Sequence, residues 1–159
     1  MQKKITTFLT FDGRAEEAVD FYTSLFPDSK ITGTRRYGDA GPGEPGSVMS
    51  ATFELAGQEF VALNGGPSFG FAQGFSLFVD CETQDEVDEL WDRFTEEGEP
   101  GPCGWLTDKF GVSWQIIPRA LGELLSDDDP EKAGAAMQAM LQMSKIEIEG
   151  LERAASSVR

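Results

Sequence analysis

The side chains that most often carry chemistry are sparse in this chain of 159 residues. It contains no histidine, the usual imidazole ligand for transition metals and the usual general base near neutral pH. Catalytic triads with histidine, the HExxH motif and histidine-containing zinc sites are therefore excluded. The two cysteines, Cys81 and Cys103, are too far apart for a zinc site and too few for a disulfide framework. A single bridge between them stays open.

Two further clusters of reactive groups have ordinary interpretations. Cys103 lies in GPCGW, but no histidine exists to activate its thiol, and the nearest cation in the sequence is Lys109. The run Asp127-Asp128-Asp129 lacks the spaced ligands of a calcium loop and is typical of a helix start. We therefore assign no catalytic residue, no metal ligand and no cofactor.

The stretch ALNGGPSFGF, residues 62–71, packs glycine, proline and phenylalanine together after a strand-like run. A phosphate cradle would need glycines that lead into a helix, whereas these lead into Phe69 and Phe71. We interpret the stretch as the rim of a binding pocket with Asn64 as its polar group. The alternative is that the glycines serve only a tight turn.

Composition restricts the partners. The formal net charge is −15, which disfavours nucleic acids and anionic membranes. Hydrophobic residues make up 40% of the chain, as in ordinary globular proteins. No segment approaches the ~20 apolar residues of a membrane span, and the N-terminal apolar run is too short for a signal peptide. We expect a single cytoplasmic domain.

Periodicity predicts one pattern of elements twice. β-branched and aromatic runs predict strands, and apolar residues at helical spacing predict helices. The first copy has a strand at 4–11, a helix at 15–26 and strands at 29–37, 47–55 and 58–64. The second has a strand at 75–81, a helix after the capping box of Thr83 and Glu86, and strands at 105–107 and 112–118. The repeat spans about 60 residues.

The rest of the chain is predicted to be helical. Asp129 is a helix cap with Pro130 at the first helical position, and Ser144 with Glu147 is spaced as a second capping box. An apolar stripe is more typical of a core or a subunit contact than of a cofactor site. It consists of Ala133, Met137, Met140 and Leu141.

Three stretches, residues 11–31, 36–69 and 103–133, resemble the PhnB-like branch of the vicinal oxygen chelate superfamily. This superfamily includes glyoxalase I, bleomycin-resistance proteins and extradiol dioxygenases, and the branch often carries a demethylubiquinone methyltransferase label. The resemblance covers residues 4 to 155. It implies an α+β fold in which two βαβββ modules form a cupped mixed sheet, with C-terminal helices and usually a homodimer. We expect module one at 1–72, module two at 73–118 and a helical tail at 119–159.

The metalloenzymes of this superfamily hold a divalent metal with four ligands, mostly His and Glu. By resemblance, the corresponding positions here offer Thr6 or Phe8, Leu63 or Asn64, Phe75 or Ser76, and Gln115. Neutral amide and hydroxyl oxygens are weak ligands for a transition metal. Close relatives often read NGGPHF, where this chain has Ser68. The resemblance thus implies a pocket without the usual metal.

We expect a small-molecule-binding protein. Alternation along the last strand puts Trp114 and Gln115 on opposite faces, and the family register points Gln115 into the cup. Polar contacts are expected from Thr6, Asn64, Ser68 and Gln115, and apolar walls from Phe8, Phe69, Phe71 and Trp105. The alternatives are a metal-dependent lyase or dioxygenase with atypical ligands, and a protein whose pocket is vestigial. A methyltransferase is disfavoured because no strand-Gly-x-Gly-helix unit is present.

Overall fold

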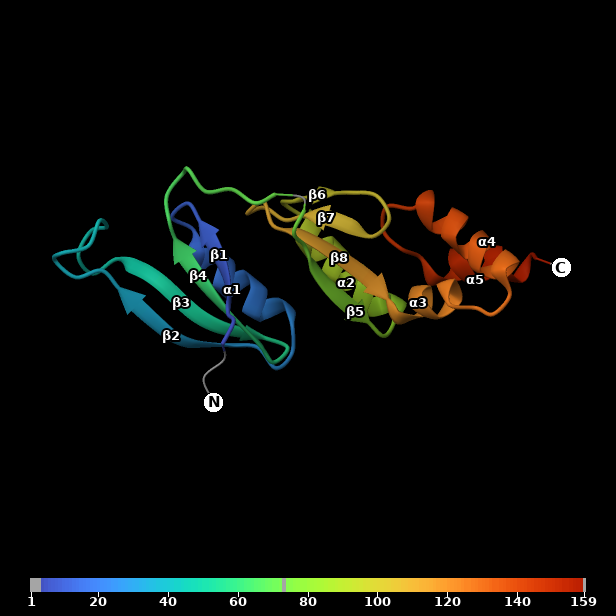
Figure 1. Ribbon diagram of the computed structural model, residues 1–159, viewed down its shortest axis with the longest axis horizontal. Helices are drawn as coiled ribbons and strands as arrows, with labels where there is room; N and C mark the ends of the chain where they lie inside the picture. The colour runs from blue at the N-terminus through green and yellow to red at the C-terminus, as the bar shows by residue number, and fades with distance from the viewer. Residues whose placement is uncertain (1–3, 73, 159) are drawn as a thin grey trace. The chain divides into compact units, whose positions relative to one another are not determined.

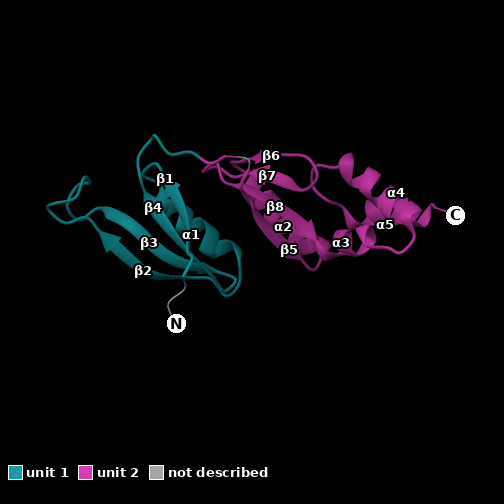
Figure 2. Ribbon diagram, in the orientation of Figure 1, with its two compact units in different colours: residues 1–70 teal, residues 71–159 magenta. Residues whose placement is uncertain are grey.

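The computed structural model describes residues 4–72 and 74–158. The chain divides into two compact units, residues 1–70 and residues 71–159, which are coloured separately in Figure 2. Each unit contains one four-stranded sheet and at least one helix, as Figure 1 shows. No helix in the described part of the chain is long and apolar enough to span a membrane.

The first unit has the order strand, helix and three strands. Its elements are β1 (Thr7–Phe11), α1 (Ala15–Leu25), β2 (Lys30–Arg36), β3 (Val48–Leu55) and β4 (Gln58–Asn64). The strands lie in the order β1-β4-β3-β2. β1 is parallel to β4, and the remaining pairs are antiparallel. The sheet is therefore mixed, as predicted.

One face of the first sheet is buried against α1. Alternate side chains of a strand point to opposite faces, so β1, β3 and β4 supply alternate residues to this core. Every residue of β2 is exposed. Phe53 and Phe60 are cross-strand neighbours there, with ring centroids 5.5 Å apart. The helix contributes its apolar stripe, which includes Ala18, Val19 and Tyr22. The other face of this sheet is described with the candidate site.

The second unit repeats this order. It contains β5 (Leu77–Cys81), α2 (Gln84–Thr95), β6 (Glu99–Pro100), β7 (Trp105–Thr107) and β8 (Ser113–Pro118), and its sheet order is β5-β8-β7-β6. β5 is parallel to β8 and the other pairs are antiparallel. The predicted repeat and the predicted α+β class with two modules are confirmed.

The core of the second unit lies between α2 and its sheet. Trp114 packs on Phe94 with ring centroids 4.7 Å apart, and its exposed fraction is only 2%. Its indole Nε1 donates to Asp108 Oδ2 at 2.9 Å. Asp108 Oδ1 also accepts from the backbone amides of Phe110 and Val112, so this buried carboxylate is well hydrogen-bonded. Trp114 therefore packs beneath α2.

The tail forms three helices that close a second apolar cluster. They are α3 (Arg119–Leu125), α4 (Pro130–Leu141) and α5 (Ile148–Ser156). Ile117 at the end of β8 is buried together with Leu121, Ile146 and Leu151. Asp129 caps α4 by accepting from Glu131 N at 2.9 Å, as predicted.

Local details differ from the sequence prediction at the ends of several strands and at one helix cap; β5, for example, begins at Leu77 rather than residue 75. The first strand begins at Thr7 rather than residue 4, and the two-residue β6 was not predicted. The capping box at Ser144 and Glu147 is wrong, because α5 begins at Ile148 without a side-chain cap. The Ser144 hydroxyl instead donates to Gly101 O at 2.6 Å. A tertiary partner has displaced the local one, which serine hydroxyls readily allow.

Candidate functional site

A row of three side chains crosses the face of the second sheet that is opposite α2. The strand register places Gln115 of β8 directly between Phe78 of β5 and Trp105 of β7. We call these three residues the amide row. Phe78 is 60% exposed, which is unusual for a phenylalanine on a sheet unless another group covers it. The row therefore presents one amide between two aromatic side chains.

The amide of Gln115 is oriented by a hydroxyl. Its Nε2 donates to Ser76 Oγ at 3.0 Å, between residues that are 39 positions apart. Among the described residues no donor is bound to Gln115 Oε1, so this carbonyl oxygen is available to a ligand donor. An amide that is held at one end and open at the other fixes the orientation of a guest.

A cavity of about 420 Å³ adjoins Trp105. Thr107 and Ser113, which are cross-strand partners on the same face as the amide row, contribute to its wall. Leu106, Pro100 and Glu99 complete much of the remaining lining. The volume lies within the range of about 300–1,000 Å³ that is typical of small-molecule sites. No lysine or arginine lines it in the described part of the chain, so it does not favour an anion.

The carboxylate nearest to the amide row is paired with a guanidinium. Asp80 follows Phe78 at the next position on the same face, and its Oδ2 lies 2.8 Å from Arg119 Nη2. Arg119 also approaches Glu82 at 3.6 Å. Hydrogen bonding to Asp80 raises the pKa of Arg119, so the guanidinium stays charged. The three side chains of the row are themselves uncharged, and the nearest carboxylate, Asp80, is paired.

The corresponding face of the first sheet is also neutral at one end. The register aligns Phe8 with Val61 and Thr52, and the next row aligns Thr10 with Leu63 and Ser50. Phe8 is 56% exposed. It is the second residue of β1, and Phe78 is the second residue of β5, so each unit carries an exposed phenylalanine at the same place in its repeat.

Phe69 folds back over the end of this neutral face. A Cβ at Gly65 would overlap Thr10 Cγ2 and would lie 3.0 Å from Phe69 Cδ2. Thr10 and the Phe69 ring therefore meet over Gly65, where a side chain has no room. The first glycine of the NGG stretch is a close-approach glycine in this structure, not part of a phosphate cradle.

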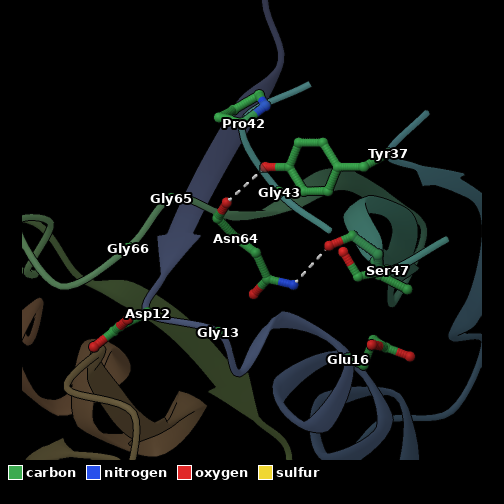
Figure 3. A pocket seen from close by; sticks show the side chains of 11 residues that line it. Asp12, Gly13, Glu16, Tyr37, Pro42, Gly43, Ser47, Asn64, Gly65 and Gly66 are labelled. Atoms are coloured by element: carbon green, nitrogen blue, oxygen red, sulfur yellow. Dashed lines mark hydrogen bonds between the residues drawn. The ribbon is translucent and has the colours of Figure 1, made fainter. Parts of the chain in front are cut away.

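Asn64 joins several segments of the first unit. Its Oδ1 accepts from Ala15 N at 2.9 Å, and its Nδ2 donates to Val48 O at 3.1 Å. The Tyr37 hydroxyl donates to Asn64 O at 3.4 Å. Asn64 and Tyr37 line a hollow of about 470 Å³. Figure 3 shows them there together with Asp12 and Glu16. The Asn64 carboxamide thus already binds the protein at both ends, and a ligand would meet only its remaining lone pair and N–H.

The eight residues expected at the site are divided between the units. The first unit holds Thr6, Phe8, Asn64, Ser68 and Phe69, and the second holds Phe71, Trp105 and Gln115. Thr6 is half-buried directly before β1, and Ser68 is exposed in the turn after Asn64. Phe71 is half-buried, and its Cδ2 lies 3.8 Å from the place that a Cβ of Gly111 would take. Of the eight, the register brings Trp105 and Gln115 together as neighbours.

Sequence reasoning missed Phe78. The signal was present, because Ser76 and Phe78 are two residues apart and a strand places such residues on one face. Phe78 was not predicted as a site residue because apolar residues in a strand generally belong to the core. Register, which joins β5 to β8, was needed to bring it beside Gln115.

The side chains at the metal-ligand positions are poor donors. They are hydroxyl, amide and hydrocarbon groups, and the chain has no histidine. Among the residues described, no group of three or more cysteine or carboxylate side chains is placed to hold a metal ion. The donor set does not fit a divalent transition metal.

Both cysteines are free thiols. Cys81 is fully buried, and desolvation, together with the nearby carboxylates of Glu86 and Asp80, raises its pKa from 9.0 to about 12. A thiol with this pKa is a poor nucleophile at neutral pH. Cys103 is half-buried in the turn before Trp105. The bridge that the sequence left open is not formed.

Fold and site together define a class: a two-module α+β protein whose sheets present neutral polar and aromatic groups. The chain belongs to the 3-demethylubiquinone-9 3-methyltransferase family, whose model matches residues 3–117. The structure of a PhnB protein from Bacillus cereus is 44% identical, with a TM-score of 0.66 over 73% of this chain and 99% of its own. Protein PA1353 from Pseudomonas aeruginosa is 21% identical, with a TM-score of 0.61 over 74% of this chain and 98% of its own, and shares the fold.

A protein from Staphylococcus aureus is 40% identical over 72% of this chain and 96% of its own, with a TM-score of 0.34. No curated protein gives a significant match. The family match ends at residue 117, directly before α3, so the three tail helices lie outside it.

Proposed function

We propose that the chain is a small-molecule-binding protein of the glyoxalase and bleomycin-resistance superfamily, and that it holds its ligand without a divalent metal. The observation that carries this proposal is the amide row, in which the carbonyl of Gln115, oriented by Ser76, lies between Phe78 and Trp105. Its preferred guest is a planar aromatic molecule, neutral or cationic, that bears an N–H or O–H donor. The donor would bind Gln115 Oε1.

The energetics fit weak, selective binding. Burial of about 200 Å² of aromatic surface contributes about 5 kcal/mol before the costs of association, and one hydrogen bond adds about 1 kcal/mol. Dissociation constants between high micromolar and millimolar are therefore expected for a small fragment. The net charge of −15 disfavours anionic guests.

The remaining expected residues would contribute on their own unit. Phe8 and Thr6 would extend the neutral face of the first sheet, with Phe69 as its wall, and Asn64 and Ser68 would line its end. Phe71 would add to the apolar surface of the second unit. Substitution of each of these residues, followed by measurement of ligand binding, tests its contribution.

Ligand-observed NMR with benzamide, 2-hydroxyquinoline and benzoate tests the proposal. The first two should bind, and the anion should not. Gln115→Leu, which keeps the size but removes the amide, should weaken benzamide binding by about fivefold. Gln58→Leu is the matched control, because Gln58 is an exposed strand residue of the first unit. If Gln115→Leu and the wild-type chain bound benzamide equally well, the amide row would not be the binding site.

Metal content is a separate check. After purification without chelators, elemental analysis should find no stoichiometric Zn, Ni, Mn or Fe. One tightly bound ion per chain would favour the alternative, a metal-dependent lyase or dioxygenase with atypical ligands.

Methyl transfer, the activity in the family's name, is the less favoured function. Nucleotide-like methyl donors are commonly held by doubly wound parallel sheets with a glycine-rich strand-to-helix turn. Each sheet here is mixed, with one parallel pair, and the NGG glycines lead into Phe69 instead of a helix. We also propose a homodimer, for which light scattering should give twice the mass of the 17.4 kDa chain.

A further inference from the structure

The tail segment between α4 and α5 is bonded to the turn that precedes Trp105. Cys103 N donates to Met143 O at 2.8 Å, and Gly104 N donates to Ser144 O at 2.7 Å. The Ser144 hydroxyl donates to Gly101 O at 2.6 Å. Three hydrogen bonds thus connect two residues of the tail to one turn, residues 101–104. We call residues 143–148 the tail clasp.

The same turn fixes the backbone of Trp105. Trp105 N donates to Pro102 O at 3.0 Å, and Gly101 N donates to Trp105 O at 2.8 Å. Gly101 therefore bonds both Trp105 and the Ser144 hydroxyl. A movement of the clasp would be passed to Trp105 through Gly101 and Gly104, which adjoin it directly.

Gly104 is packed from both sides. A Cβ there would lie 2.7 Å from Ile117 Cδ1 and 3.0 Å from Ile146 Cγ1. Its φ of +85° is also in the region that glycine adopts without strain. The turn, β8 and the clasp therefore meet at a position where any other residue would be strained, and Ile146 of the clasp is fully buried.

The far end of the clasp is held by α2. Gln84 Nε2 donates to Ile146 O at 2.9 Å, and Gln84 Oε1 accepts from Ile148 N at 2.7 Å. Lys145 Nζ lies 2.9 Å from Asp88 Oδ1. The clasp is thus attached at both ends, to the turn before Trp105 and to the first turns of α2.

We infer that the tail clasp positions Trp105 in the amide row, with Ser144 as the positioning residue. This rests on the proposed function for its consequence in binding, and it assigns a role to a segment beyond the end of the family match at residue 117. Ser144 does not touch the ligand. It holds Gly101, which holds Trp105. Binding of an aromatic guest and docking of the clasp therefore stabilise each other.

The test uses the full chain labelled with 5-fluorotryptophan. The chain has three tryptophans, and Trp→Phe substitutions assign the fluorine resonances of Trp91, Trp105 and Trp114. Ser144→Ala should shift or broaden the Trp105 resonance and leave that of Trp91 unchanged. Ser144→Thr, which restores the hydroxyl, should return the Trp105 resonance toward the wild-type position. Ser156→Ala is the matched control, because the Ser156 hydroxyl donates to Arg153 O within its own helix, α5.

A second measurement follows the consequence for binding. Ser144→Ala should weaken benzamide binding by about fivefold, the effect of one hydrogen bond on an equilibrium, and Ser156→Ala should not change it. An unchanged Trp105 resonance in Ser144→Ala would contradict the inference that the tail clasp positions Trp105. If benzamide does not bind the wild-type chain, the proposed ligand is wrong, and the fluorine spectrum still decides whether the clasp positions Trp105.

Discussion

Asn64 Oδ1 accepts a hydrogen bond from Ala15 N at 2.9 Å, which joins the end of β4 to the first turn of α1 across 49 positions of sequence. The Nδ2 of the same carboxamide donates to Val48 O, and this second bond holds the start of β3. α1 has no side-chain cap from its own N-cap residue, Arg14. Asn64 supplies from a distant strand the acceptor that a local cap would supply.

Asn64→Ala should therefore destabilise the first unit. The hydrogen bonds to Ala15 N and Val48 O are both lost, for an expected loss of about 2 kcal/mol in the free energy of unfolding. Urea denaturation measures the loss, and hydrogen exchange should show faster exchange at the first turn of α1. Gln58→Ala, an exposed position on the same strand, serves as control. A wild-type midpoint in Asn64→Ala would show that the bond does not contribute to stability.

Gly65→Ala should be destabilising by about 1–3 kcal/mol, because the new methyl group would overlap Thr10 Cγ2 and press on the Phe69 ring. Removal of the Thr10 methyl in Thr10→Ser should recover part of this loss in the double variant. Gly70→Ala is the control, since nothing lies within 4 Å of its Cβ position. If Gly65→Ala and Gly70→Ala had the same thermal midpoint, the close approach at Gly65 would be disproved.

The Lys145–Asp88 pair of the clasp should give a pH-dependent contribution to stability. Hydrogen bonds from Gln84 and from Lys145 lower the pKa of Asp88 below its ordinary value of 3.8. The bond to Asp88 raises the pKa of Lys145 above 10.5.

A carboxyl group whose pKa is lower in the folded chain than in the unfolded chain stabilises the fold at every pH above its unfolded-state pKa. This contribution is lost as the pH falls through its folded-state pKa. A lysine whose pKa is higher in the folded chain stabilises the fold at every pH below its unfolded-state pKa. This contribution is lost as the pH rises through its folded-state pKa.

The difference in unfolding free energy between the wild-type chain and Asp88→Asn should thus be constant between about pH 5 and 9 and shrink in acid. Because Asp88 is 41% exposed, the plateau should be small, about 1 kcal/mol or less. Urea titrations across this pH range give the profile. Asp85→Asn, on the same helix, is the control. A difference that grows in acid would contradict the assignment.

The two thiols should differ in reactivity. Because the pKa of Cys81 is raised to about 12, only about one molecule in 10,000 carries its thiolate at pH 8, and the side chain is buried as well. Iodoacetamide at pH 8 should therefore modify Cys103 first in the native chain and Cys81 only after denaturation. Peptide mass spectrometry distinguishes the two sites. Early labelling of Cys81 would show that the second unit opens readily at β5.

Much of the fold followed from local pattern. Alternation and helical spacing indicated the repeated order of strands and helices, and the Asp129–Pro130 start of α4 followed from capping preferences. These signals are local because backbone hydrogen bonding and side-chain direction repeat every two or 3.6 residues. The Ser144–Glu147 box failed although its spacing is correct, because a carbonyl 43 positions away, at Gly101, binds the serine hydroxyl.

The site was only partly predictable for the same reason. Gln115 and Trp105 could be named from the sequence, but Phe78 joined them only through the pairing of β5 with β8. Asn64 could be named as a polar group at a strand end, yet its partners are Ala15 and Val48, which no local rule connects to it.

The sequence by itself determined which groups are available: no imidazole, few thiols, many carboxylates, and strands that carry amide, hydroxyl and aromatic side chains. Tertiary structure alone decided which of them meet. Strand register set Gln115 between two aromatic residues, and packing of the tail closed on the turn before Trp105. Composition fixes the possible interactions, whereas neighbours on different strands are chosen by the burial and backbone pairing of the whole unit.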